Sequence, residues 1–560
     1  MNKLRLIYTL FALSVFLSCS HEKATIVLIN GKIITVDKNF SIQEAVAIGG
    51  DTIMHVGNTD EINKYIGAET HVIDLKGKAA TPGMVDAHCH PFGLGRDDKD
   101  DSFSVRGSKS WQEVIDKVAE KVKTLQPGEW IIGGGWYQDE WEDNTIPVHD
   151  GLSAVSPDNP VFLYRRGGNS AFVNAKALEI AGITKDTPDP YGGKIGRKPD
   201  GKPSGFLVNM GNNMVKKHFP KPEKPPEWYE KIFKNAAKKC NAAGLTGWHD
   251  AGLEPLYLEA YKRLVDKDEL TIRVNAMLQN PRKGDLEKYF AKHRILNYGG
   301  RDMLQIRSVK MFFDGALGSR GAALHKPYDD DPENTGVYEV PPEHVYEVSV
   351  AALKTGMQVC SHSIGPRANH ELLNEYERAL KKVPVKDHRF RSEHAEIITP
   401  SDVKRFAQLG VIPSVQPVHH TSDMEFLPYR LGNERCKTMA SPWRSLIDEG
   451  CILPCGSDFA IYSHNPLTGI YAAVTRKNED GTPENGYYEE QCLTREEAIK
   501  GYTIWPAYAA FLENKTGSIE KGKYADITVF DKDILTIDPE ELLKTQVIYT
   551  IVAGKIVYAK

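Results

Sequence analysis

The sequence has little of what marks the specialised classes of protein. It contains no run of lysine and arginine, and 70 basic residues against 75 acidic ones give a formal net charge of −5. Because nucleic acid selects basic surfaces, we do not expect nucleic acid as a partner. The composition, 41% hydrophobic and 26% charged residues, is that of an ordinary globular protein, so 560 residues predict one large domain with one or two smaller ones.

The apolar segment at the N-terminus, residues 6–17, is too short to cross a bilayer. It follows Lys3 and Arg5 and precedes a small residue and Cys19, a layout typical of a secretory signal. Its end resembles a bacterial lipoprotein cleavage site, although Phe16 stands where leucine is usual. We therefore expect a signal peptide over residues 1–19, a lipid anchor on Cys19, and a location in the bacterial cell envelope, in the periplasm or at the outer membrane. A plain signal peptide or an uncleaved anchor is the alternative.

Cysteine is scarce as well. Eight cysteines are present, and seven remain if Cys19 is lipidated. Seven is an odd number, and Cys89 and Cys360 stand beside histidines that are candidate metal ligands. A full disulfide framework is therefore not expected, even in an exported protein.

The two ends of the chain share one pattern of short apolar runs separated by turn residues. Near the N-terminus, Asn30-Gly31 between two β-rich runs predicts a hairpin. We expect residues 24–80 and 513–560 to pair into one small β-sandwich domain. Between them, residues 81–512 alternate strand-like and helix-like segments, which predicts an α/β fold, a (β/α)8 TIM barrel. Residues 105–240 interrupt this alternation and are expected to form an insertion near the mouth of the barrel.

A pair of histidines ends the first expected barrel strand. Side chains on a strand alternate between its two faces, so His88 and His90 point the same way and can hold one metal ion. In such barrels functional residues lie at the C-terminal ends of strands. Four more candidates occupy such positions: Lys310, His362, His394 and Asp458. Each alone has an ordinary structural explanation, since lysines snorkel, histidines fill cores and Gly-Ser-Asp forms turns, but together they indicate a metal site.

With these segments the chain resembles the amidohydrolase superfamily, in the YtcJ-like branch related to N-substituted formamide deformylase. The resemblance covers roughly residues 25–560. It rests on the order and spacing of segments 81–90, 309–320, 362–365, 393–395, 414–417, 456–458 and 517–526. It implies a barrel that holds one or two divalent metals, flanked by a small sandwich, and a hydrolase acting on a non-peptide carbon–nitrogen bond.

The resemblance also implies a role for each candidate ligand. His88, His90 and Asp458 would hold one metal, His362 and His394 the other, and Lys310, carboxylated by CO2, would bridge both. Imidazole and carboxylate ligands suit zinc, while iron or manganese would also fit. A metal-activated hydroxide would attack an amide, N-acyl or formamide carbonyl, with Asp458 as general acid and base.

Substrate contacts are less well determined by the sequence. The resemblance places Trp136 and Arg320 near a small-molecule substrate, although Trp136 could equally be a packing residue and Arg320 could pair with Asp314. Gln416 and His419, with His420, follow another strand and are expected to line the same mouth or to lie on the surface. A homodimer is a possible assembly. The chain departs from the family it resembles at Tyr137, Asn169 and Pro366, where aspartate, histidine and aspartate are usual. None of these is a candidate metal ligand, so the departures leave the expected metal site intact and the identity of the substrate open.

Two other functions use the same residues. A metal site of this kind could also hydrolyse a lactone or a cyclic imide, or catalyse an isomerisation. The chain could instead be a lipid-anchored binding protein on a hydrolase fold that has lost its activity. Retention of all six ligand positions argues against the second, because a binding protein has no need of the whole set.

Overall fold

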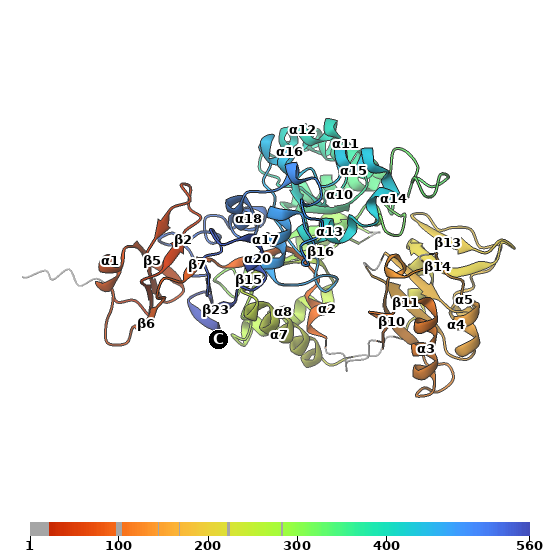
Figure 1. Cartoon of the computed structure of the whole chain (residues 1–560), viewed down its shortest axis with the longest axis horizontal. Helices are drawn as coiled ribbons and strands as arrows, with labels where there is room; N and C mark the ends of the chain where they lie inside the picture. Colours follow the sequence, from red (N-terminus) through yellow and green to blue (C-terminus); the bar gives the residue numbers. More distant parts are fainter. Residues whose placement is uncertain (1–21, 97–102, 144, 167–168, 221–223, 282–283) are drawn as a thin grey trace, which may run out of the picture.

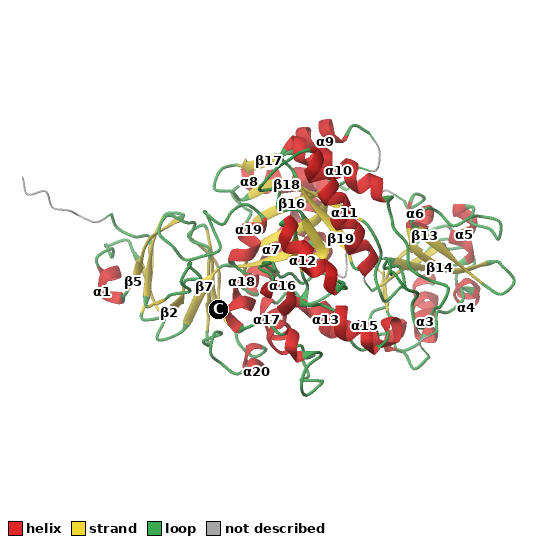
Figure 2. Cartoon of the chain, turned by 90° about the horizontal axis from the view of Figure 1, so that it is seen from above, coloured by secondary structure: helices red, strands yellow, loops and turns green. Residues whose placement is uncertain are grey.

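The computed structural model describes residues 22–560, except 97–102, 144, 167–168, 221–223 and 282–283. The expected signal peptide and Cys19 lie outside the described residues. Within the described part of the chain, no helix is both long enough and apolar enough to cross a membrane. Figure 1 shows a central barrel with the β-strands of the two chain ends on one side and the insertion on the other, and Figure 2 shows the same order from above.

The centre of the molecule is a barrel of parallel strands. Seven strands are neighbours in this order: β8 (Met84–Cys89), β15 (Leu245–Leu253), β16 (Arg273–Gln279), β18 (Leu304–Phe312), β19 (Gln358–Ser363), β20 (Arg391–His394) and β21 (Ile412–Ser414). Residues 452–458 close the gap between β21 and β8, because Val415 bridges Cys455 in parallel and the Ala87 N–H donates to the Cys455 carbonyl. A nearly closed barrel of eight parallel segments confirms the predicted TIM barrel.

Helices cover the outside of the barrel, and their sequences explain where they begin and end. Several of them start on proline, whose fixed φ suits the first helical turn, among them α7 (Pro226–Ala242), α8 (Pro255–Asp266), α10 (Pro342–Thr355), α11 (Pro366–Lys382) and α12 (Pro400–Leu409). Helices α10 and α12 end at Gly356 and Gly410, which adopt the left-handed conformation that glycine tolerates best. Pro366, one of the departures from the family, is thus the first residue of α11.

Strands from both chain ends form two sheets beside the barrel. The first sheet has the order β5 (Thr52–Gly57), β4 (Ala45–Gly49), β1 (Ile26–Ile29) and β6 (His71–Asp74). The second has the order β24 (Lys555–Ala559), β23 (Val547–Val552), β22 (Ile527–Phe530), β7 (Ala79–Pro82), β2 (Lys32–Ile34) and β3 (Ile42–Gln43). Because β22 pairs with β7, the two chain ends share one sheet. Apolar side chains of both sheets, including Leu28 and Ile527, pack in one core.

The hairpin predicted at Asn30-Gly31 is wrong. Strands β1 and β2 flank this turn but pair with other strands, β1 with β4 and β6, and β2 with β3 and β7. The turn carries the chain from one sheet to the other, with Asn30 at φ 55°. A turn signal in the sequence fixes the local reversal of the chain but not the partners of the two strands.

The insertion forms a separate lobe with its own core. Its sheet has the order β13 (Gly193–Arg197), β14 (Pro203–Asn209), β12 (Ser170–Val173), β11 (Val161–Arg165), β10 (Ile131–Trp136) and β9 (Phe103–Ser104), and its helices are α3 (Trp111–Val122), α4 (Asp150–Val155), α5 (Ala175–Ala181) and α6 (Met210–Lys216). The predicted span of 105–240 extends too far at its end. Helix α7 packs against α8, β15 and α2 (Pro91–Gly95), so it belongs to the barrel.

Candidate metal centre

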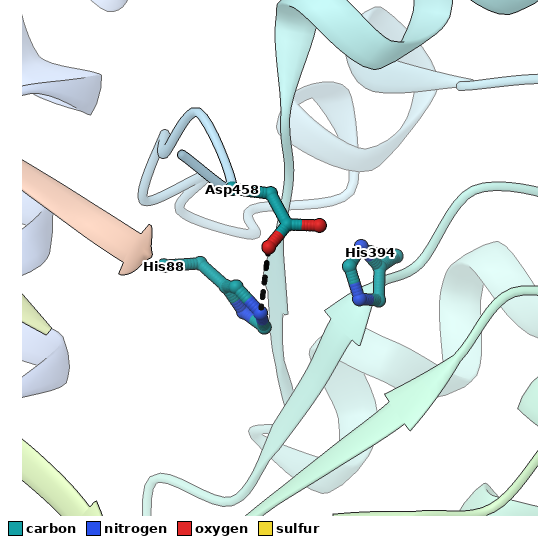
Figure 3. A group of neighbouring side chains, drawn as sticks. All are labelled: His88, His394 and Asp458. Atoms are coloured by element: carbon teal, nitrogen blue, oxygen red, sulfur yellow. Dashed lines mark ion pairs between the residues drawn. The ribbon is translucent and has the colours of Figure 1, made fainter. Parts of the chain in front are cut away.

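The six expected ligands come together in one cavity at the C-terminal ends of the barrel strands. They come from different parts of the barrel: His88 from β8, His90 from the residue after it, Lys310 from β18, His362 from β19, His394 from β20 and Asp458 from the closing segment. Figure 3 shows His88, His394 and Asp458 facing a common point. One ligand atom from each of these three lies within 4.8 Å of the other two.

Other distances show that all six side chains lie around this point. The Nε2 atoms of His90 and His88 lie 3.0 and 3.9 Å from Asp458 Oδ1. Lys310 Nζ lies 3.2 Å from His88 Nε2. The rings of His362 and His394 are in contact, with centroids 4.4 Å apart. Residues separated by up to 370 positions in the chain therefore share one small volume.

Two of the histidines have buried nitrogen atoms that bond to nothing within the described chain. His362 Nε2 and His394 Nδ1 have no hydrogen-bond partner there, although both side chains are buried. Such an atom is costly unless something binds it. Burial holds the pKa of both imidazoles well below the ordinary value, so both rings are neutral and each can offer a lone pair. These residues fit a divalent metal, as does the mixed set of imidazole and carboxylate groups.

A buried carboxylate orients His88. Glu393 Oε2 lies 2.5 Å from His88 Nδ1, so this nitrogen carries the proton and Nε2 turns its lone pair to the cavity. Arg391 donates to Glu393 at 2.9 Å and to the Ser414 hydroxyl at 2.8 Å. Burial alone would raise the pKa of Glu393, but Arg391 and His88 hold it well below its usual range. A charged Glu393 therefore fixes both the tautomer and the direction of His88.

A second buried carboxylate fixes Asp458 against His88. Asp86 accepts hydrogen bonds from the Ser457 hydroxyl at 2.6 Å and from the His88 N–H at 3.0 Å, and the Asp458 N–H donates to the His88 carbonyl at 2.8 Å. Asp458 and His394 both adopt positive φ, 55° and 77°, a conformation that is uncommon for residues other than glycine. Such strain persists where surrounding contacts fix the backbone, and it is frequent at functional sites.

Neighbouring histidines favour an ionised Asp458, and burial favours a readily deprotonated Lys310. Burial by itself would raise the pKa of Asp458, but the nearby His419 and His90 hold it well below its usual value. Burial lowers the pKa of Lys310, which is 1% exposed, to about 8. An appreciable fraction of the lysine is then neutral close to physiological pH.

Of the five residues expected near the substrate, only His419 lines the cavity, with Nε2 3.4 Å from Asp458 Oδ2. Trp136 is buried in the core of the insertion, where its indole N–H donates to the Leu163 carbonyl. Arg320 pairs with Asp330 rather than Asp314.

Asp314 and Gln416 are buried in supporting positions rather than in the cavity wall. Asp314 accepts the backbone N–H groups of Ala323, Ile364 and Gly365 at 2.8–2.9 Å. The Gln416 amide donates to the carbonyl of Ser414. His420, the other histidine after β21, is buried beside Trp443.

The sequence did not point to several other residues that line the cavity. From the insertion come Tyr137, Arg165, Arg166 and Asn169, and from the barrel come Phe312, Glu396, Asp423, Phe426 and Tyr462. Two of them, Tyr137 and Asn169, are positions where the sequence departs from the pattern usual in the family. Because they face the same cavity as the ligands, the departures lie where a substrate would lie.

The chain is similar to known hydrolases in sequence and in fold. A family model described as amidohydrolase family matches residues 71–558. The putative amidohydrolase YtcJ of Bacillus subtilis is 32% identical, over 92% of this chain and 96% of its own. N-substituted formamide deformylase of Arthrobacter pascens is 27% identical, over 96% of this chain and 98% of its own. The crystal structure of an uncharacterized metal-dependent hydrolase from Pyrococcus horikoshii matches with a TM-score of 0.72 and 27% identity, over 92% of this chain and 99% of its own.

Proposed function

Because the chain belongs to the amidohydrolase family, we propose that it is a metal-dependent hydrolase of a non-peptide carbon–nitrogen bond in a small amide, N-acyl or formamide-type substrate. The observation that carries this proposal is the meeting of six strand-end residues in one cavity, with two buried imidazole nitrogens that lack a partner within the described chain. The similarity to N-substituted formamide deformylase supports the type of bond.

His88, His90, His362, His394 and Asp458 would hold one or two divalent ions. Imidazole with carboxylate favours zinc and also accommodates iron or manganese. Bound divalent ions polarise a substrate carbonyl and lower the pKa of water towards neutrality, which makes water nucleophilic at physiological pH. Glu393 and Asp86 keep His88 and Asp458 in position for this without contacting the substrate themselves.

Asp458 moves the proton in this proposal. Its low pKa leaves a carboxylate that can accept a proton at Oδ2 from the attacking water. The water oxygen bonds to the carbonyl carbon, the carbon–nitrogen bond breaks, and Asp458 passes the proton to the departing nitrogen. A carboxylic acid and an amine result, and a formamide would give formate. Without that proton an amide nitrogen leaves poorly, so Asp458 would serve as both ligand and acid–base group.

Lys310 would act as its carbamate. An ammonium group 3.2 Å from His88 Nε2 would repel a cation held there. The neutral amine can add to CO2 and release a proton, which converts a buried cation into an anionic group with two oxygen ligands. The burial of Lys310 favours the neutral amine that this reaction requires.

Hydrolysis of matched substrates tests the proposed reaction. We expect the purified protein to release amine from N-alkyl formamides or N-acyl amino acids, and to lose this activity with a chelator and regain it with Zn²⁺, Fe²⁺ or Mn²⁺. The measurement is amine release by chromatography, with lactones and cyclic imides of similar size in the same panel. Turnover of lactones or imides alone would contradict the assigned bond, and turnover unaffected by metal removal would contradict the assigned chemistry.

A further inference from the structure

Two acidic side chains in the cavity wall have no part in the proposed metal centre. Glu396 follows β20 by two residues, and Asp423 ends α13 (Pro417–Asp423). Glu396 is only 5% exposed, and its Oε1 atom has no hydrogen-bond partner among the described residues. The carboxylate of Asp423 accepts a hydrogen bond of 3.2 Å from the Tyr462 hydroxyl. A carboxylate that is buried and unpartnered at the wall of a cavity needs a ligand to offset its desolvation.

In the described part of the chain, His419 and Arg165 lie near enough to Asp423 to lower its pKa, but no lysine or arginine forms an ion pair with either acid. Neither Glu396 nor Asp423 lies within ion-pair distance of a lysine or arginine there. Burial raises the pKa of Asp423 itself to about 6. Glu396 thus has a buried carboxylate oxygen without a partner among the described residues, and a positive ligand beside it would offset the cost of its burial.

The arginines of the same wall are already satisfied. Arg165 forms an ion pair with Asp139 and donates to the Gln138 side chain at 2.8 Å. Arg166 pairs with Glu140 at 2.7 Å. A ligand carboxylate would compete with these acidic partners for the arginines, whereas a ligand cation would meet Glu396 and Asp423, which form no ion pair with a lysine or arginine of the described residues.

We propose that Glu396 and Asp423 form a subsite for an organic cation, and that the substrate carries an ammonium group at some distance from the bond that is cut. This inference rests on the proposed hydrolase function, whose reacting centre shares the cavity. The aromatic rings of Phe426 and Tyr462 line the same wall, and aromatic faces attract ammonium groups. The substrate class is then an amide or formamide of a diamine or of a related amino compound.

Three formamides of equal length test the subsite in the metal-loaded protein. N-formyl-1,4-diaminobutane ends in an ammonium group, N-formylpentylamine in a methyl group, and 5-formamidopentanoate in a carboxylate. We expect kcat/KM for the first to exceed that for the second by about tenfold or more, because a charge-assisted hydrogen bond contributes about 1.5–3 kcal/mol. In Glu396→Gln and Asp423→Asn the ratio should fall to about threefold or less. Glu434→Gln, the same change at an exposed residue of α15 (Asn433–Met439), should leave it unaltered.

Binding of a cation without a scissile bond separates this inference from the proposed function. Choline and 3,3-dimethylbutan-1-ol have the same shape and hydroxyl, and only choline is charged. Calorimetry should show choline binding about tenfold more tightly to the wild-type protein and to Glu434→Gln, and the two ligands binding alike to Glu396→Gln and Asp423→Asn. Circular dichroism and thermal unfolding establish that these variants are folded.

The outcomes are distinct. If no formamide is hydrolysed but choline binds selectively through Glu396, the reaction is misassigned and the cation subsite stands. If formamides are hydrolysed without preference for the ammonium group, or with preference for the carboxylate, the subsite is wrong and the reaction stands. A preference for choline that survives both substitutions would also overturn it.

Discussion

Replacement of Asp458 by asparagine is expected to lower kcat for the hydrolysed substrate by about a thousandfold, with little change in thermal stability. General acid–base catalysis alone contributes about 10²–10⁴-fold, and an amide can neither accept the proton of water nor return it to nitrogen. Asparagine keeps the size of the side chain, and the backbone bond from residue 458 to the His88 carbonyl does not depend on the carboxylate.

Steady-state kinetics on the best formamide or N-acyl substrate, together with thermal unfolding, give the measurement. Asp116→Asn is the matched control, because Asp116 is exposed on α3 far from the barrel strands. If Asp458→Asn retained activity within about threefold of wild type, Asp458 could not be the acid–base group, since that role alone is worth at least a hundredfold.

Replacement of Lys310 by alanine is expected to abolish most activity, by about a thousandfold, and short carboxylic acids should restore part of it. The substitution removes the group that, as its carbamate, would supply oxygen ligands, and it leaves room for acetate or propionate beside His88 and His362. Added carboxylate would then take the place of the missing oxygens. Lys292→Ala, which alters an exposed lysine of α9 (Leu286–His293), should be as active as wild type and insensitive to these acids.

Labelling with ¹³C-bicarbonate provides a direct readout of the carbamate. Carbon NMR of the wild-type protein should show a carbamate resonance that is absent from Lys310→Ala. An unmodified Lys310 in active enzyme would contradict the bridging role, and the lysine would then be a hydrogen-bonding neighbour of His88 at a site that needs one metal.

The six candidate metal ligands could be found from the sequence because the barrel imposes a rule on where functional residues lie. Parallel strands present their C-terminal ends on one face, so a residue type suited to metals at each strand end predicts a common site without knowledge of distances. His88 and His90 share a face for the simpler reason that strand side chains alternate. The structure brings all six into one cavity, as that rule requires.

Contacts that depend on pairing between distant segments could not be found in this way. Glu393 precedes His394 in the chain, yet its partner is His88, 305 positions away, and no local pattern reveals that pairing. The sequence likewise could not show that the turn at Asn30 joins two different sheets, because the partners of β1 and β2 are strands from other parts of the chain.

The residues of the insertion show most clearly which side-chain positions the sequence cannot predict. Trp136 and Tyr137 are neighbours, and the structure buries the first in the core of the insertion and turns the second to the cavity. Trp136 ends β10 and Tyr137 follows it with an extended backbone, so their side chains face opposite ways. A prediction that is wrong by one residue would therefore place Trp136 in the cavity and Tyr137 in the core. A glycine-rich strand such as β10 carries too little apolar alternation to fix that phase from sequence.

Metal content of the purified protein tests the central claim most directly. Inductively coupled plasma mass spectrometry should find about one or two divalent ions per wild-type chain. The variants His88→Ala and His394→Ala should each lose at least one of these ions while remaining folded. Exposed His71, replaced by alanine, should leave the metal content unchanged. A wild-type protein that hydrolyses its substrate fully while holding no stoichiometric metal, or variants that keep all of it, would contradict a metal centre built from these strand ends.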